Sequence, residues 1–337
     1  MKTIQVGPNS VHFTRFIKEV VARNITCAIV SDDHLSEVSS LGALHLGTFK
    51  SFNLLTLFRE YRKLKGFLKK EQPQIVHVHQ INRLAFFATR AARKLKIPVI
   101  STAWGSDVLL MPQKNKLNAA LVRYVIKHST YVTADAQSMI DAMQKIIPSE
   151  TKYKHIQYGI EVVKPAEKEN IIFSNRFLTP LYRIAQIIEY FIPFSAKHPE
   201  WKLVIASTGS DEALLKSMVD VNSISDKVEF VGWLTKEENE FWYAKSKVYI
   251  SIPSSDGTSV SVLEAMSAGC IPILSDLQVS KEWIIHLKNG ILEQESINPF
   301  LELDKIDSNT LQQINFKLIE DKASKAKCMT KFIALYH

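Results

Sequence analysis

The sequence predicts an α/β protein made of two Rossmann-like domains, and three observations support this prediction. Short apolar runs typical of buried strands alternate with amphipathic helical segments along almost the whole chain. The alternation occurs twice, and a polar, charged stretch at 160–169 separates the two series and is expected to be a linker. At 337 residues the chain exceeds the usual size of one core, so two domains are expected.

Each half of the chain repeats the same order of strand and helix. The first half predicts strands at 2–6, 26–30, 43–47, 74–78, 97–102, 129–133 and 153–157, with helices at 53–70, 83–95 and 135–147 among them. The second half predicts strands at 170–174, 202–206, 227–230, 247–251, 271–274 and 290–292, and helices at 182–197, 211–221, 236–244 and 259–268. This order indicates parallel sheets covered by helices on both faces. We therefore expect domains at 1–160 and 161–310 with sheets facing across a cleft, and a helical tail at 311–337.

The composition is that of a globular protein, with 46% apolar and 23% charged residues. No run of about 18 apolar residues predicts a membrane-spanning helix, and Gly7-Pro8 comes too early for a signal peptide. The three cysteines, Cys27, Cys270 and Cys328, are widely spaced and fit no metal-binding pattern. These features favour a reducing, cytoplasmic location with buried free thiols.

The charge is distributed unevenly between the two halves. Residues 1–160 carry 23 Lys and Arg against 10 Asp and Glu, a net charge of +13, whereas the remainder carries 19 against 24, a net charge of −5. This asymmetry predicts that the first half faces an anionic partner. Nucleic acid, anionic lipid and a lipid-linked diphosphate all satisfy it, although no nucleic-acid recognition motif is present.

The predicted helix at 53–70 is both basic and amphipathic. Its apolar residues recur at helical spacing, and six Arg and Lys side chains occupy the other face. Two interpretations stay open and are compatible. The apolar stripe packs against the sheet and the basic face is solvated, or the helix lies on an anionic membrane, where each cation contributes about 1 kcal/mol.

The segment from Asp256 to Glu264 is the most informative part of the sequence. A small, polar turn, Gly257-Thr258-Ser259, follows Asp256, and an apolar helix beginning near Val260 carries Glu264. Such a turn presents backbone N–H groups at a helix N-terminus, which suits a phosphate or diphosphate. The two carboxylates are then placed to bind the hydroxyls of a sugar and of a ribose. The alternative is an ordinary capped helix.

This segment, with Leu263-Glu264-Ala265-Met266 and Gly269-Cys270-Ile271-Pro272 following, resembles the E-x(7)-E region of the family 4 retaining glycosyltransferases, which have the GT-B fold. Asp256 stands where the family has its first Glu. The resemblance implies a nucleotide-diphosphate sugar as donor, with Glu264 on the ribose, Asp256 on the sugar, and Gly257, Thr258, Ser259 and Val260 near the phosphates. It also implies that the C-terminal tail crosses back to the first domain.

Two further segments resemble donor-binding motifs of that family. Thr102-Ala103-Trp104-Gly105-Ser106-Asp107 resembles its "T-x-H-G-x-D" loop, with Trp104 in place of His; Asp107 is a candidate catalytic or helix-capping residue. Ser174-Asn175-Arg176 and Tyr182-Arg183 resemble its "G-R-L-x-x-x-K-G" segment, with Tyr182 at the Lys position. Arg176 and Arg183 are therefore expected to bind the diphosphate, or else to be surface arginines beside a strand.

Weaker signals come from Gly7, Glu282 and a pair of histidines. Gly7 ends the first strand and permits either close approach of a donor or an ordinary turn. Glu282 lies where the family's "P-E" loop approaches the nucleotide. His77 and His79 share one strand face, which permits a metal site but favours a structural or cleft-lining role, since no carboxylate follows nearby.

Together these resemblances imply a retaining glycosyltransferase, and we expect it to use no metal or cofactor. Its acceptor is expected to be a glycan or lipid-linked sugar of bacterial surface polysaccharide assembly, such as lipopolysaccharide or capsule, with possible peripheral contact with an anionic membrane. Two alternatives remain. One is another GT-B enzyme, an epimerase or an inverting transferase with His12 or Asp107 as base; the other is a non-catalytic protein that binds a nucleotide or a partner protein.

Overall fold

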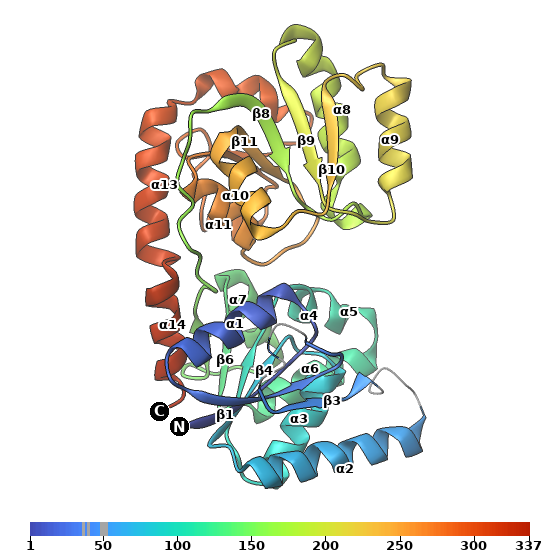
Figure 1. Cartoon of the computed structure of the whole chain (residues 1–337), viewed down its shortest axis with the longest axis vertical. Coiled ribbons are helices and arrows are strands. Elements are labelled where there is room, and N and C mark those ends of the chain that lie inside the picture. The colour runs from blue at the N-terminus through green and yellow to red at the C-terminus, as the bar shows by residue number, and fades with distance from the viewer. Residues whose placement is uncertain (36–37, 39–40, 48–52) are drawn as a thin grey trace. The chain divides into compact units, whose positions relative to one another are not determined.

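The computed structural model describes residues 1–35, 38, 41–47 and 53–337. The chain divides into two compact units, 1–157 with 329–337, and 158–328 (Figure 1). The segment 160–169 was expected to be a linker but belongs to the second unit. Ile160 is buried there, and the backbone N–H of Val163 donates to Ser267 Oγ at 3.0 Å.

The first unit contains a seven-stranded parallel sheet in the order β3-β2-β1-β4-β5-β6-β7. Its strands are β1 (Lys2–Gly7), β2 (Thr26–Ser31), β3 (Ala43–His45), β4 (Ile75–His79), β5 (Val99–Thr102), β6 (Tyr131–Ala134) and β7 (Tyr153–His155). Its helices are α1 (Val11–Ala22), α2 (Leu54–Glu71), α3 (Arg83–Lys94), α4 (Ser106–Leu109), α5 (Met111–Lys114), α6 (Lys116–His128) and α7 (Gln137–Ile146). The strand order reverses between β1 and β4, as in doubly wound folds.

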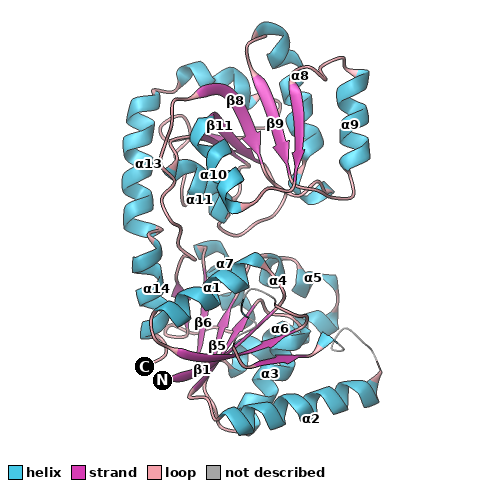
Figure 2. Ribbon diagram, viewed as in Figure 1, coloured by secondary structure: helices cyan, strands magenta, loops and turns pink. Residues whose placement is uncertain are grey.

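The second unit contains a six-stranded parallel sheet in the order β10-β9-β8-β11-β12-β13. Its strands are β8 (Glu169–Ser174), β9 (Lys202–Ala206), β10 (Val228–Gly232), β11 (Ser246–Ser251), β12 (Ile271–Leu274) and β13 (Ile291–Leu292). Its helices are η3 (Pro180–Tyr182), α8 (Ile184–Lys197), α9 (Glu212–Val221), α10 (Lys236–Lys245), α11 (Val260–Ser267), α12 (Gln278–Lys281), η4 (Pro299–Lys305) and α13 (Ser308–Lys322). The prediction of an α/β fold with two parallel sheets is confirmed (Figure 2).

Alternate residues of each central strand face opposite sides of the sheet, which gives the second unit two apolar cores. Ile172 packs with the core formed with α8 and α9, whereas its neighbour Phe173 packs with the core that includes α11 residues such as Leu263. Both strand neighbours are completely buried. A doubly covered sheet of this kind holds the loops at its carboxyl edge in fixed positions.

The C-terminal segment is helical, as predicted, but it is shared between the units. α13 lies in the second unit, α14 (Lys325–Ala334) follows it, and residues 329–337 belong to the first unit. There the ring of Phe332 lies 5.1 Å from that of Phe16, and Tyr336 is buried. The end of the tail therefore returns to the first unit, as the resemblance implied, whereas residues 311–328 belong to the second unit.

His77 and His79 are buried in the interior of the first unit. His77 Nδ1 lies 2.8 Å from the Tyr336 hydroxyl and Nε2 lies 2.7 Å from Thr102 Oγ1, while His79 Nε2 lies 3.0 Å from Gln5 Oε1. Burial lowers the pKa of His77 to about 3, and it lowers the pKa of His79 well below its ordinary value. These contacts give both rings a structural role.

We expect the free energy of unfolding to fall as the pH falls below about 6.5, the pKa of unfolded histidine. The unfolded state then binds protons that the folded state rejects, so between pH 7.5 and 5.5 His77 alone costs about 1.4 kcal/mol. Urea unfolding at the two pH values measures this loss. A His77→Gln variant is expected to reduce the loss, whereas His34→Gln, at an exposed position, is not. An equal loss in both variants contradicts the explanation.

Candidate active site

The candidate site lies at the carboxyl edge of the second sheet, where the strand order reverses between β8 and β11. The loop after β8 carries Arg176, and the loop after β11 carries Asp256. Ligands of doubly wound sheets bind at such reversal points, because the loops after the two strands separate there. Both residues were expected to follow strands, and those two strands are neighbours in the sheet.

Arg176 joins the two loops through a set of short polar contacts. Its Nη2 lies 2.6 Å from Asp256 Oδ2, and its Nη1 donates to the hydroxyls of Ser259 and, at 3.2 Å, Ser261. The guanidinium also stacks 4.4 Å from the ring centre of Tyr182. We call these five residues, Arg176, Tyr182, Asp256, Ser259 and Ser261, the Arg176 cluster. Tyr182, which the family resemblance aligns with a lysine, has its ring against the guanidinium.

The Arg176–Asp256 pair is largely withdrawn from solvent, with side chains 12% and 23% exposed. Burial raises the pKa of Asp256, and the Arg176 guanidinium and the Gly257 N–H, which donates to Asp256 Oδ1 at 3.0 Å, lower it only in part. Burial acts to lower the pKa of Arg176, but Asp256 and the surrounding tyrosines outweigh it and raise that pKa. The Arg176 guanidinium is thus a partly buried cation, and the Asp256 carboxylate is its counterion.

The helix α11 begins at this cluster. Its N-cap, Ser259, makes no side-chain capping bond, and its hydroxyl instead contacts Arg176 and Ser261 Oγ, the latter at 2.8 Å. Within the first helical turn, the N–H of Val262 donates to the Ser259 carbonyl at 3.1 Å, whereas the N–H groups that precede it have no acceptor in the α-helical pattern. The helix dipole favours an anion there. Glu264 is half-buried further along α11, close enough to Tyr243 and Tyr249 to help raise the pKa of both hydroxyls.

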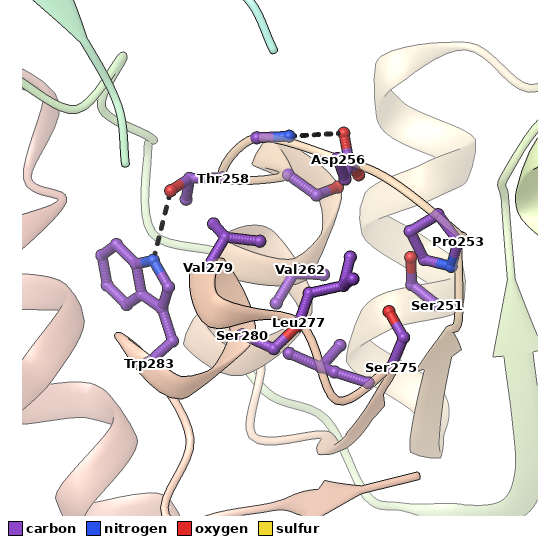
Figure 3. Close-up of a pocket in the computed structure, with 13 residues that line it drawn as sticks. Ser251, Pro253, Asp256, Thr258, Val262, Ser275, Leu277, Val279, Ser280 and Trp283 are labelled. Atoms are coloured by element: carbon purple, nitrogen blue, oxygen red, sulfur yellow. Dashed lines mark hydrogen bonds between the residues drawn. The ribbon is translucent and has the colours of Figure 1, made fainter. Parts of the chain in front are cut away.

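An open pocket lies behind the 256–259 loop (Figure 3). Trp283 Nε1 donates to Thr258 Oγ1 at 3.3 Å on one side, and the buried hydroxyl of Ser275 has no hydrogen-bond partner among the described residues. Asp256 and Gly257 also line this pocket. Trp283 and Ser275 were missed by the sequence analysis, although both follow β12 at the predicted carboxyl edge.

Arg183 is held by a different carboxylate. Its Nη1 and Nη2 lie 2.8 and 2.9 Å from the two oxygens of Glu293, which also accepts from the Tyr190 hydroxyl at 2.8 Å. Glu293 is 9% exposed and was missed by the sequence analysis, although a charge directly after the last strand, Ile291-Leu292, was a usable signal. Arg183 thus has a carboxylate partner of its own and does not share Asp256 with Arg176.

We expect Arg183→Ala to lower the free energy of unfolding by about 1 to 3 kcal/mol, because it leaves the Glu293 carboxylate without its cation. If Arg183 is only structural, affinity for a nucleoside diphosphate stays within two-fold of the wild type, roughly 0.4 kcal/mol. Urea unfolding and calorimetric titration measure the two quantities. A large loss of affinity with unchanged stability instead restores the predicted diphosphate contact. The exposed Lys197→Ala variant is the matched control.

Two known families match most of the chain. Residues 5–136 match the family "Glycosyl transferase 4-like", and residues 159–308 match "Glycosyl transferases group 1". The chain belongs to the group 1 glycosyltransferases. Membership of the glycosyltransferase family, expected from the sequence, is therefore confirmed, and the chain has the two-sheet GT-B fold.

Several named proteins resemble this glycosyltransferase. An uncharacterized glycosyltransferase of Haemophilus influenzae is 28% identical over 44% of the chain and 45% of its own length, so the chain matches less than half of that relative. Alpha-monoglucosyldiacylglycerol synthase of Acholeplasma laidlawii is 22% identical over 72% of the chain and 68% of its length. The structure of Anabaena HepE in complex with UDP and glucose superposes with a TM-score of 0.82, 10% identity and 99% coverage of both chains.

In the first unit of the glycosyltransferase, Asp107 connects two loops. Its carboxylate oxygens accept from the backbone N–H groups of Ile81, at 2.7 Å, and Trp104, at 2.9 Å, and its side chain is buried. Burial raises its pKa to about 6, although those N–H groups act in the opposite sense. Gly105 precedes α4 with φ 111°, a conformation that favours glycine, and His12 lies edge-on to Trp104 at 6.0 Å. Asp107 thus fixes the Trp104 loop.

The last two residues predicted to contact the donor are Gly7 and Glu282. A Cβ on Gly7 would lie 2.8 Å from the ring of Phe13, so glycine is required there by the packing of a buried phenylalanine. Glu282 ends α12 and is half-buried beside Trp283. The structure therefore brings together Arg176, Asp256 and Ser259 among the predicted residues, whereas Arg183 and Gly7 have other contacts.

Proposed function

We propose that this protein is a retaining glycosyltransferase that moves a sugar from a nucleotide-diphosphate sugar to a glycan or lipid-linked acceptor. The Arg176 cluster is the observation that carries the proposal. It combines a cation, two hydroxyls and a helix N-terminus at the point of the sheet where ligands bind. The solved complex of HepE with UDP and glucose supports the choice of donor class.

In this proposal the donor's diphosphate binds Arg176, the serine hydroxyls and the first-turn N–H groups of α11. The phosphate oxygens then share the guanidinium with Asp256, which accepts hydrogen bonds from the sugar hydroxyls. Glu264 accepts from the ribose hydroxyls. In the first unit, Asp107 holds the Trp104 loop by accepting from the backbone N–H of Trp104. Thr258 is held by Trp283 beneath the phosphates.

The reaction breaks the bond between the sugar C1 and the phosphate oxygen and forms a bond from C1 to an acceptor oxygen on the same face of the ring. The acceptor hydroxyl gives its proton to the leaving diphosphate, and the nucleoside diphosphate departs with the electron pair of the broken bond. Arg176 and the N-terminus of α11 stabilise the negative charge that develops on this leaving group. These groups supply the positive charge that a divalent cation gives in other transferases, so we expect no metal requirement.

We further propose that the acceptor belongs to bacterial surface polysaccharide assembly and that the reaction takes place on the cytoplasmic side. Two relatives named GDP-mannose:cellobiosyl-diphosphopolyprenol alpha-mannosyltransferase match parts of the chain, at 30% identity over 24% of it and 24% identity over 43% of it. The basic first half suits a polyprenyl diphosphate acceptor.

The test is to mix the protein with a panel of nucleotide sugars and follow donor consumption by nuclear magnetic resonance, with and without a metal chelator. The proposal requires turnover of at least one donor, an unchanged rate with chelator, and a product with the donor's anomeric configuration. An inverted product identifies an inverting transferase. Conversion of the donor sugar without transfer identifies an epimerase, and thermal stabilisation without turnover identifies a nucleotide-binding protein. Each of these three results contradicts the proposal.

A further inference from the structure

One side of α2 presents an uninterrupted exposed surface. At 100° per residue, Leu54, Leu55 and Phe58 occupy the same half of the helix as the six basic residues Arg59, Arg62, Lys63, Lys65, Lys69 and Lys70. All nine are exposed. We call this surface the α2 face. Figure 1 shows α2 along the outer edge of the first unit.

The apolar residues of the α2 face are strongly exposed. Leu54, Leu55 and Phe58 are 80%, 81% and 61% accessible, whereas Leu64 and Leu68 on the opposite side of the helix are completely buried. The stripe predicted from the sequence is therefore divided, since its C-terminal part packs into the unit and its N-terminal part does not. Three large apolar side chains gathered at one end of a helix mark a surface that binds a partner.

The charges of the α2 face all have one sign. The acidic residues of the helix lie on the other side, where Glu60 is 3% exposed and is paired with Lys63 at 3.0 Å and Arg59 at 3.4 Å. Glu71 is paired with Lys2 at 2.8 Å. The α2 face has an apolar end bordered by cations and carries no exposed carboxylate. Such a surface is complementary to an anionic lipid surface.

We propose that the α2 face docks the protein on an anionic membrane, with Leu54, Leu55 and Phe58 inserted among the lipids and the cations at the headgroups. The 18-residue helix is about 27 Å long, enough for both groups to contact one surface at once. Among the described residues, no helix is long and apolar enough to cross a bilayer. This inference does not depend on the proposed transfer reaction.

Co-sedimentation of the full chain with vesicles tests the docking. We expect binding to phosphatidylcholine vesicles that contain phosphatidylglycerol, little binding to phosphatidylcholine alone, and weaker binding at high salt. The triple variant Leu54→Ser/Leu55→Ser/Phe58→Ser and the triple variant Arg62→Gln/Lys65→Gln/Lys69→Gln are each expected to lose at least about ten-fold in partition coefficient. Equal binding to both vesicle types, or wild-type binding by both variants, overturns the proposal.

Two matched control variants replace the same kinds of exposed side chain in the second unit. Val162→Ser/Leu214→Ser/Val221→Ser removes three exposed apolar residues, and Lys197→Gln/Lys202→Gln/Lys317→Gln removes three exposed charges. Both are expected to bind as the wild type does. Circular dichroism and the unfolding midpoint establish that every variant is folded. A loss in the controls equal to that in the α2 variants means that the α2 face is not the docking surface.

A fluorescent label reports insertion directly. The native thiols Cys27, Cys270 and Cys328 are all buried, so a Leu55→Cys variant can be labelled selectively with an environment-sensitive dye. Its emission is expected to shift to the blue with phosphatidylglycerol vesicles, whereas the emission of labelled Leu214→Cys is not. If the shift instead appears without vesicles and follows protein concentration, with a dimer on size-exclusion chromatography, the occupant is a second copy of the chain and the proposal is wrong.

Discussion

Glu264→Ala is expected to abolish detectable sugar transfer while the protein stays folded. Glu264 is half-buried on α11, beyond the helix end that Arg176 contacts. A carboxylate that accepts two ribose hydroxyls loses two charged hydrogen bonds, about 3 to 6 kcal/mol, or roughly a hundred- to ten-thousand-fold in kcat/KM. Alanine has the higher helix propensity, so α11 is expected to form in the variant.

The ribose role can be separated from a general loss of activity. We expect the wild type to bind the ribose form of its nucleoside diphosphate more tightly than the 2′-deoxy form, and Glu264→Ala to bind both alike. Titration calorimetry measures the four affinities. Glu320→Ala, an exposed glutamate on α13, is the control and is expected to match the wild type. If Glu264→Ala still discriminates between the two nucleotides, Glu264 does not hold the ribose.

The sequence predicted the elements of the fold well because burial imposes a readable pattern. The strands at 202–206 and 271–274 were predicted with the bounds that the structure shows, and the other strands differ by a few residues at their ends. Central strands of parallel sheets are covered on both faces, so they read as short apolar runs. The carboxyl-edge loops that carry Arg176 and Asp256 were located from the same pattern.

The partners of those side chains could not be predicted in the same way. Arg176 and Asp256 are 80 residues apart, and Arg183 and Glu293 are 110 residues apart. Which carboxylate meets which arginine depends on the strand order β8-β11-β12-β13, which the sequence pattern does not determine. The two arginines were therefore expected to share one diphosphate, whereas each has a carboxylate of its own.

Helical periodicity also predicted α2 without predicting which part of it packs. The spacing of apolar residues treats Leu54 and Leu64 alike, yet one is 80% exposed and the other is completely buried. Contact with the rest of the unit depends on the length and position of its neighbours, which are tertiary properties. Similarly, Gly7 was interpreted as a point of donor approach or as an ordinary turn, because the sequence does not show that the ring of Phe13, six residues later, packs against it.

Arg176→Ala is expected to weaken binding of the nucleoside diphosphate by about ten- to hundred-fold, since it removes charged hydrogen bonds worth about 1.5 to 3 kcal/mol. The same change leaves the Asp256 carboxylate, 23% exposed, without its cation. Because the pair is partly solvated, we expect a loss of about 2 to 3 kcal/mol in the free energy of unfolding, below the range for fully buried pairs. Calorimetric titration and urea unfolding measure the two effects.

The loss of stability has a predictable dependence on pH. Burial raises the folded-state pKa of Asp256 even in the wild type, and removing Arg176 removes the main influence that lowers it. A carboxyl group whose pKa is raised by folding stabilises the protein below its unfolded pKa of about 3.9 and loses that contribution as the pH rises through the folded pKa. Arg176→Ala should therefore be more destabilising at pH 7 than at pH 4.

The double variant Arg176→Ala/Asp256→Ala separates the two roles of the pair. The double variant contains neither the cation nor the carboxylate, so no buried charge lacks a counterion. We therefore expect it to recover most of the stability at pH 7 and to lose the pH dependence of the single variant. Affinity for the nucleoside diphosphate should remain low, because the cation is still absent. Recovery of affinity together with stability would mean that Arg176 only neutralises Asp256, and the phosphate contact would then have to be assigned to the N-terminus of α11 alone.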